Sequence, residues 1–179
     1  MKEILNIRKV CNFYVSTTHL TTMMVPFIHK KLNMDINIST FLQYNLNENI
    51  DILLSKLILN DNSREEIKSI NWKSTNMYKY SNIEKILKET IKNAKQIMII
   101  VAGDEKRIDF VNQCIDKFLD KNSKKVGNKK ITIINCYEVS QFNNNILEIL
   151  DKHQFILNTS GEHLIEEYFE GYERKQAID

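Results

Sequence analysis

The segment from Ile131 to Gly161 constrains the fold most, because it reads as a strand, a helix and a second strand. The β-branched run over residues 131–134 predicts the first strand, a helical pattern follows over residues 143–152, and a second apolar run covers residues 155–158. Parallel strands need a crossover connection of this kind, usually a helix. The segment therefore predicts an α/β fold built on a mostly parallel sheet.

A second apolar run, Gln96–Ala102, is almost uninterrupted by polar residues. The strands of a parallel sheet are buried on both faces and so lack polar alternation. Further strands are expected at residues 9–15 and 35–44, with amphipathic helices between the strands. The chain therefore reads as one domain over residues 1–179, with a central sheet covered by helices on both faces. Helices are expected around residues 20–28, 46–57, 81–94, 106–119, 143–152 and 161–172, whereas residues 61–79 allow either a short strand or a packed loop.

The composition limits the cellular setting. A chain of 179 residues with 42% hydrophobic residues and a formal net charge of +2 can bury a core. Met1–Val10 is mixed and charged, so we expect no secretory signal, and no run approaches the roughly 18 apolar residues of a membrane span. Three cysteines without CxxC spacing indicate a reducing compartment. We therefore expect a cytoplasmic chain that does not enter a membrane.

The predicted site lies where strands of the sheet end. Right-handed crossovers place the carboxyl ends of the strands at residues 9–15, 96–102 and 131–137 at one edge of the sheet. Ligands of open α/β sheets bind beyond this edge. We expect a shared ligand pocket there, in which Tyr137 and Glu138 orient the ligand and His153 supports them. The predicted ligand-binding residues are Tyr14, Ser16, Cys136, Tyr137, Glu138 and His153.

Sequence features of common catalytic and cofactor sites are missing. After the first strand the chain reads FYVSTTHLTT, without the glycines and lysine of a phosphate-binding loop, and Gly103 is followed by two acids that would repel a phosphate. No HExxH or CxxC spacing occurs, so we predict no metal and no other cofactor. Cys136 and His153 could form a thiolate–imidazole pair, although Glu138 would raise the pKa of the thiol. An enzyme that uses Cys136 or an atypical nucleotide site therefore stays open as an alternative.

Charge is distributed unevenly along the chain. Residues 131–179 carry a net charge of −6, which leaves +8 for residues 1–130. The lysine loop at residues 121–130 could contact phosphates, so a nucleic-acid adaptor that uses this loop is a further alternative. No aromatic residues interleave with these lysines, which disfavours a platform for stacked bases, and a solvated loop is the simpler interpretation. The residues of this alternative are Lys124, Lys125, Lys129 and Lys130.

Residues 131–155 resemble the end of the MEDS domain, the sensory domain named for methanogens, methylotrophs and the dichloromethane-responsive repressor. The opening at residues 13–16 and the helix after Gly103 also resemble that family. Glu138 stands where the family usually has Asp, and Gln154 stands where it usually has Pro. The positions that match the family's final motif are Cys136, Tyr137, Glu138, Phe142 and His153.

The resemblance implies a degenerate relative of the RecA/KaiC-like ATPases that has lost the Walker motifs. It also implies a role in sensing or regulation, often of small hydrocarbon-like signals. We therefore predict a non-catalytic sensory or regulatory domain that binds a small ligand or a protein partner in signalling or transcriptional regulation. We expect no output module within this chain, so it would act through a partner or by self-association.

Overall fold

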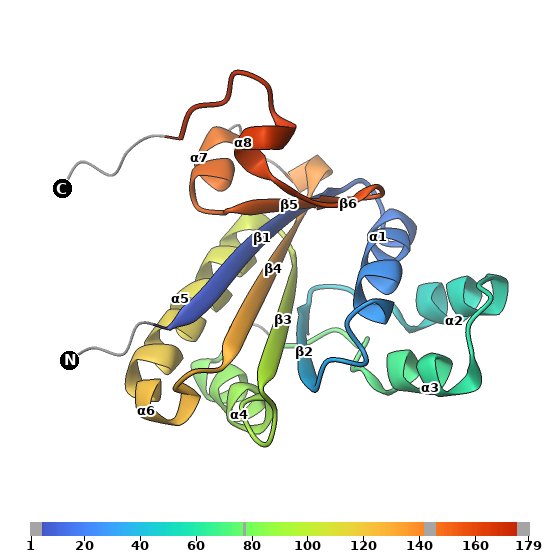
Figure 1. Ribbon diagram of the computed structural model, residues 1–179, viewed down its shortest axis with the longest axis horizontal. Helices are drawn as coiled ribbons and strands as arrows, with labels where there is room; N and C mark the ends of the chain where they lie inside the picture. The colour runs from blue at the N-terminus through green and yellow to red at the C-terminus, as the bar shows by residue number, and fades with distance from the viewer. Residues whose placement is uncertain (1–4, 77, 142–145, 175–179) are drawn as a thin grey trace.

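The chain folds around one six-stranded sheet, with strand order β2-β3-β4-β1-β5-β6. The computed structural model describes residues 5–76, 78–141 and 146–174. The first five strands are parallel, and β6 runs antiparallel to β5 at one edge (Figure 1). The predicted α/β fold with a mostly parallel sheet is therefore confirmed. The strands are β1 Asn6–Tyr14, β2 Ile36–Leu42, β3 Gln96–Gly103, β4 Lys130–Glu138, β5 Phe155–Asn158 and β6 Gly161–Leu164.

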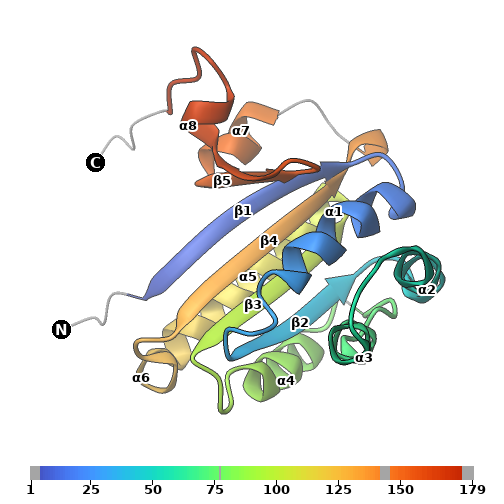
Figure 2. The same ribbon diagram turned by 45° about the vertical axis from the view of Figure 1, so that its right-hand side comes forward.

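Helices cover both faces of the sheet (Figure 2). One face packs on α1, α2 and α3, and the other packs on α4, α5, α7 and α8. We call the first apolar layer the α1 core and the second the α5 core. A short helix, α6, joins α5 to β4, and a turn of 3-10 helix follows β4 at Val139–Gln141. The helices are α1 Thr17–His29, α2 Asn47–Lys56, α3 Asp61–Ser69, α4 Tyr80–Thr90, α5 Glu105–Lys121, α6 Ser123–Val126, α7 Ile146–Asp151 and α8 Ile165–Tyr168.

The inner strand β3, which pairs with β2 and β4, explains why this sheet is covered on both sides. Successive side chains of a strand point to opposite faces. Ile97, Ile99 and Val101 lie in the α5 core, whereas the residues between them lie in the α1 core. The continuous apolar run seen in the sequence therefore fills two cores at once, as expected for a strand in the middle of a parallel sheet.

Local side-chain chemistry fixes the start of the first helix. The Ser16 hydroxyl accepts a hydrogen bond from the His19 N–H at 3.1 Å and so caps α1, as its position in the sequence suggests. Pro26 lies inside α1, which ends within one further turn at His29. Proline removes one backbone donor, and the helix nevertheless continues because its buried face packs on the sheet.

Two sequence-based expectations about secondary structure are wrong. Residues 61–69 form helix α3 and not the short strand or packed loop that was expected. The Asn60 side chain caps this helix by accepting a hydrogen bond from the Ser63 N–H at 2.7 Å. The expected helix over residues 161–172 begins instead as strand β6. Gly161 adopts a positive φ of 114° and closes a tight turn with β5, so turn chemistry prevails over the helical spacing of apolar residues.

Candidate functional site

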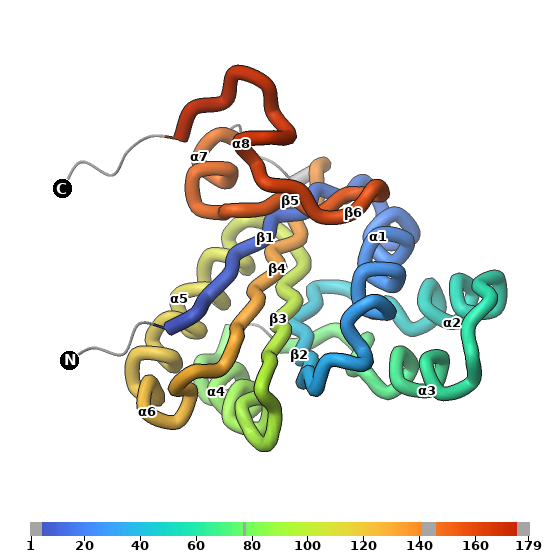
Figure 3. Tube along the Cα trace, viewed as in Figure 1, coloured from blue at the N-terminus to red at the C-terminus, as the bar shows by residue number. Residues whose placement is uncertain are grey.

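The carboxyl edge of the sheet gathers the strand ends that the sequence places there. Tyr14 pairs in register with Glu138, and Gly103 pairs with Tyr137. From β1 the chain crosses to β2, whereas from β4 it crosses to β5 on the other side of β1, as the trace in Figure 3 shows. Strand order therefore reverses between β1 and β4, which is the switch point where ligands of such sheets usually bind.

A chain of polar side chains runs along this edge. The Tyr44 hydroxyl donates to Glu138 Oε2 at 3.1 Å, and the Ser140 hydroxyl donates to Glu138 Oε1 at 3.1 Å. The Gln43 amide donates to the Tyr44 oxygen at 3.1 Å, while Gln43 Oε1 accepts from the Asp104 N–H at 2.8 Å. The Glu138 carboxylate is thus held by two neutral donors, and the edge is ordered by contacts within the protein.

Gly103 allows the close approach that this arrangement needs. A Cβ atom at this position would lie 2.6 Å from Gln43 Oε1 and 3.0 Å from Gln43 Cβ. We expect Gly103→Ala to displace Gln43 from Asp104 and to lower the free energy of unfolding by about 1–2 kcal/mol, the cost of one lost buried hydrogen bond and some strain. Urea denaturation would measure the loss. The same change at Gly171 is the control, because the added Cβ meets nothing within 4 Å there; its φ of 80° is also positive, so this variant measures a backbone penalty without the clash.

The six predicted site residues do not share one pocket. Tyr14 and Cys136 lie in the α1 core, whereas Tyr137 lies in the α5 core with its ring centroid 6.0 Å from that of His153. Neighbouring residues of one strand point to opposite faces, so Cys136 and Tyr137 cannot face the same cavity. Only Ser16 and Glu138 remain at the edge itself. The expectation of a single shared pocket is therefore corrected, and Phe142 of the resemblance lies outside the described residues.

Cys136 is surrounded by the α1 core. The residue is 0% exposed, and its Sγ lies 4.0 Å from Met24 Sδ. Burial raises the pKa of the Cys136 thiol, and the nearby Cys11 raises it further. His153 sits on the other face of the sheet, against α7 and β4. The two side chains suggested by the sequence as a thiolate–imidazole pair are thus separated by the sheet.

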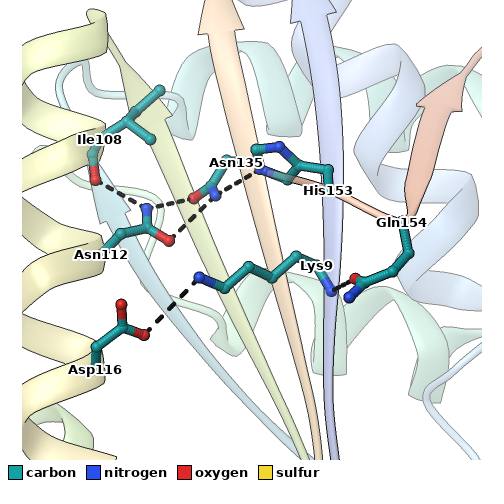
Figure 4. Close-up of polar contacts among 7 residues, drawn as sticks. All are labelled: Lys9, Ile108, Asn112, Asp116, Asn135, His153 and Gln154. Atoms are coloured by element: carbon teal, nitrogen blue, oxygen red, sulfur yellow. Dashed lines mark hydrogen bonds and ion pairs between the residues drawn. The ribbon is translucent and has the colours of Figure 1, made fainter. Parts of the chain in front are cut away.

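A buried polar network lies on the α5 face instead (Figure 4). Asn135 Nδ2 lies 2.9 Å from His153 Nε2, and Asn135 Oδ1 accepts from Asn112 Nδ2 at 2.8 Å. The same Asn112 amide donates to the Ile108 carbonyl at 2.8 Å. The network joins α5, β4 and the turn before β5, so three elements meet at one set of amide and imidazole groups.

The contacts of His153 fix its protonation. Its Nδ1 lies 2.6 Å from the Ile149 carbonyl, which can only accept, so Nδ1 carries the proton. Nε2 is then the acceptor for Asn135. Burial lowers the pKa of His153 to about 4, against a smaller opposing effect of the Ile149 hydrogen bond. At neutral pH the imidazole is therefore neutral, and both of its nitrogens are engaged.

A polar cavity of about 280 Å³ opens beside this network, and we call it the α5 cavity. Asn112, Asn135, Tyr137 and His153 form part of its wall. Charged side chains of both signs stand at its rim, where Lys9 Nζ lies 3.9 Å from Asp116 Oδ1 and Lys152 Nζ lies 3.9 Å from Asp109 Oδ1. The remaining lining residue is Gln113.

The turn that carries His153 is held firmly to β1. The Lys9 N–H donates to Gln154 Oε1 at 2.7 Å (Figure 4), and the Gln154 N–H donates to the Lys9 carbonyl at 3.0 Å. Arg174 donates to the carbonyls of Asp151 and His153 at 2.9 and 2.6 Å. One wall of the α5 cavity is therefore preorganised.

Asn112, Asn135 and Lys9 were missed by sequence reasoning, although an asparagine within the apolar run of β4 is a usable signal for a buried polar site.

The lysine loop is more structured than its composition suggests. Helix α6 occupies its centre, and Lys125, Lys129 and Lys130 line a surface cavity that Lys124 does not reach.

Among the described residues, no group of histidine, cysteine, aspartate and glutamate is arranged to hold a metal ion. In that same part of the chain, no helix has the length and apolar character needed to cross a membrane.

Of the comparisons with known proteins, only that with solved structures found similar proteins. No protein-family model matches the chain, and no curated protein matches it. Among solved structures, the chain is similar to a KaiC-like protein from the hyperthermophilic archaeon Pyrococcus horikoshii. The two share 15% sequence identity and superpose with a TM-score of 0.46 over 83% of this chain and 69% of that chain.

Proposed function

We propose that the chain is a non-catalytic regulatory domain that binds a small polar ligand in the α5 cavity. The observation that carries this proposal is the state of the side chains around the cavity. The groups best suited to acid–base or nucleophilic chemistry are buried and neutral: His153 has both nitrogens engaged, and Cys136 lies beyond the sheet. A general base needs a free acceptor within reach of its substrate. Such an arrangement favours recognition over turnover.

The geometry of the α5 cavity suggests how binding could be transmitted. Its walls come from α5, from β4 and β1, and from the turn between α7 and β5. A ligand that contacts these walls would stabilise one arrangement of them relative to others, and this differential affinity is what a sensor needs. The resemblance to the MEDS domain supports the same role, with a partner protein or a second copy of the chain as the recipient of the signal. The same resemblance supports the proposal that this chain is related to RecA-like proteins. The free cysteines agree with a cytoplasmic location.

A thermal-shift screen tests the ligand proposal. The screen should include polar metabolites with both amine and acid groups, together with nucleotides, fatty acids and small hydrophobes. A ligand that binds the native state raises its apparent stability, by about 2.7 kcal/mol at a hundredfold excess over Kd. We expect a hit whose effect shrinks at least severalfold in Asp116→Asn, which changes the cavity rim. Asp120→Asn, one turn further along α5 and outside the cavity, is the matched control. A hit unaffected by Asp116→Asn, or the lack of any hit, would contradict this site.

The enzyme alternative has its own test. All three cysteines are free and buried, at 0%, 5% and 0% exposure for Cys11, Cys114 and Cys136. Because the thiolate is the reactive form, we expect iodoacetamide to label the native chain slowly at neutral pH and quickly only after unfolding in urea. Rapid and selective labelling of Cys136 in the native protein would favour the enzyme over the regulatory domain.

A further inference from the structure

The amino edge of the sheet, opposite the carboxyl edge described above, carries two adjoining cavities. The first has a volume of about 630 Å³ and lies between the segment before β3 and the segment between α6 and β4. The second has a volume of about 400 Å³ and lies beneath the end of α1. Gln96 and Lys130 line both cavities, so the two form one continuous surface that we call the basic edge. The cationic residues of the basic edge are Arg8, Lys31, Lys95, Lys125, Lys129 and Lys130.

The positive charge of the basic edge is poorly compensated. Among the residues that the structure describes, no aspartate or glutamate lines either cavity. Arg8 is paired with Glu162, but the five lysines form no ion pair with any described residue. The lysines of α4 differ, since Lys88 and Lys92 are each paired with a glutamate. Like charges gathered from four separate segments repel one another and favour the binding of an anion.

The segments that carry these cations are fixed to one another. The Lys130 N–H donates to the Lys95 carbonyl at 3.1 Å, and Gln96 pairs with Lys130 across β3 and β4. The Gln96 side chain also donates to the Met34 carbonyl at 2.9 Å, which joins the end of the α1 segment to the same point. Figure 2 shows the amino ends of β2, β3 and β4 together at the lower end of the sheet. The backbone segments that carry the cations are therefore fixed relative to one another before any ligand arrives, so that binding has to order the side chains and not the backbone.

The second cavity adds apolar surface to the charge. Phe27, Met34, Met98 and Ile131 line it together with Arg8 and Lys31. The Lys31 ammonium lies 5.6 Å from the centre of the Phe27 ring. An apolar wall beside cations suits a ligand that has an organic body as well as anionic groups. Both cavity volumes fall in the range of roughly 300–1,000 Å³ typical of small-molecule sites.

We propose that the basic edge binds a small organic anion with two phosphate-type groups, one in each cavity, and with its apolar body against Phe27 and Met34. The first group contacts Lys95 and Lys125, and Lys130 stands between the two. Lysine binds phosphate as a point charge with three donors, so a cluster of lysines needs no glycine-rich loop. The site lies at the opposite edge of the sheet from the switch point, and it stands independently of the α5 cavity.

Calorimetric titration with adenosine 3′,5′-bisphosphate tests this site, with inorganic tripolyphosphate and adenosine as the two partial probes. We expect the bisphosphate to bind more tightly than tripolyphosphate, adenosine not to bind, and affinity to fall as salt is raised. The triple variant Lys95→Gln, Lys125→Gln, Lys130→Gln should weaken bisphosphate binding roughly tenfold or more, because each charge-assisted contact contributes substantially. The triple variant Lys73→Gln, Lys79→Gln, Lys85→Gln makes the same change in net charge at exposed residues that line neither cavity, and should weaken binding less than twofold.

Several outcomes would overturn the proposal. One is the absence of bisphosphate binding, and another is equal weakening in the two triple variants. A third is that a twenty-nucleotide single strand binds although the bisphosphate does not, which would indicate an extended nucleic-acid surface. Circular dichroism confirms that both variants are folded. If the site variant unfolds, Lys125→Gln alone, an exposed change on α6, is expected to weaken binding severalfold, and unchanged affinity would count against the site. Asp116→Asn should leave bisphosphate binding unchanged, so this test and that of the α5 cavity can fail separately.

Discussion

Replacement of Asn135 by leucine is expected to lower the free energy of unfolding by about 3 kcal/mol. The change keeps the approximate size of the side chain but removes the hub of the buried network. His153 Nε2 loses the one hydrogen-bonding neighbour that it has among the described residues, and the Asn112 amide loses its contacts at 2.8 and 3.2 Å. A buried polar group left without a partner costs about 1–3 kcal/mol, which is more than the net contribution of a typical hydrogen bond. Urea denaturation, with a check that the slope m is unchanged, measures the loss.

The chain offers a matched control on the opposite face of the sheet. Asn12 of β1 is 0% exposed, compared with 2% for Asn135, so the two positions are equally buried. Its Nδ2 donates to the Leu157 carbonyl at 2.9 Å and lies 3.1 Å from Met23 Sδ, while its Oδ1 is buried without a hydrogen-bond partner in the described structure. Asn12→Leu therefore removes one unsatisfied acceptor as well as one hydrogen bond, and we expect a loss of about 1 kcal/mol or less. Equal losses at both positions would show that burial alone, and not the network, sets the cost.

The parallel sheet was predictable because its signal is local. A strand buried on both faces is apolar at nearly every position, and residues 97–102 meet that condition in the sequence. The cap at Ser16 is a local signal of the same kind, since it depends only on residues 16–19. The hairpin of β5 and β6 was missed because residues 161–172 also show helical spacing of apolar residues. The backbone conformation of Gly161, at the turn between β5 and β6, decides between a helix and a hairpin. The spacing of apolar residues carries no information about that conformation.

The site was harder to predict than the fold. Sequence analysis placed residues at the correct edge of the sheet, because the carboxyl ends of parallel strands must meet there. It could not divide them between faces, since this requires the phase of each strand, and a shift of one residue exchanges the two faces. Cys136 and Tyr137 illustrate the difficulty, because they are adjacent in sequence and lie in different cores. Asn112 could not be linked to Asn135 at all, because 23 residues separate them and only the packing of α5 on β4 brings them together.

Acidification is expected to destabilise the chain through His153. The pKa of His153 is lowered from 6.5 to about 4 in the folded state, chiefly because burial disfavours the charged imidazolium. Between these two values the unfolded chain binds a proton that the folded chain does not, so stability falls as the pH decreases. The resulting loss in the free energy of unfolding is close to zero above pH 7 and reaches about 2 kcal/mol at pH 5. Protonation at Nε2 would also turn the acceptor for Asn135 into a donor, which opposes the observed network.

Urea denaturation at half-unit steps from pH 7.5 to pH 5 would isolate this effect. His153→Gln is expected to be less stable than the unaltered chain at pH 7.5 but to lose about 2 kcal/mol less on acidification, because the titrating group is gone. His163→Gln is the control, since it removes an imidazole that lies on β6, is only partly buried and bonds to Ser160 at 2.7 Å, outside the buried network. Parallel pH profiles for His153→Gln and the unaltered chain would mean that folding leaves the pKa of His153 unchanged. The claim that burial and the Asn135 contact keep this imidazole neutral on acidification, and with it the neutral wall of the α5 cavity, would then have to be abandoned.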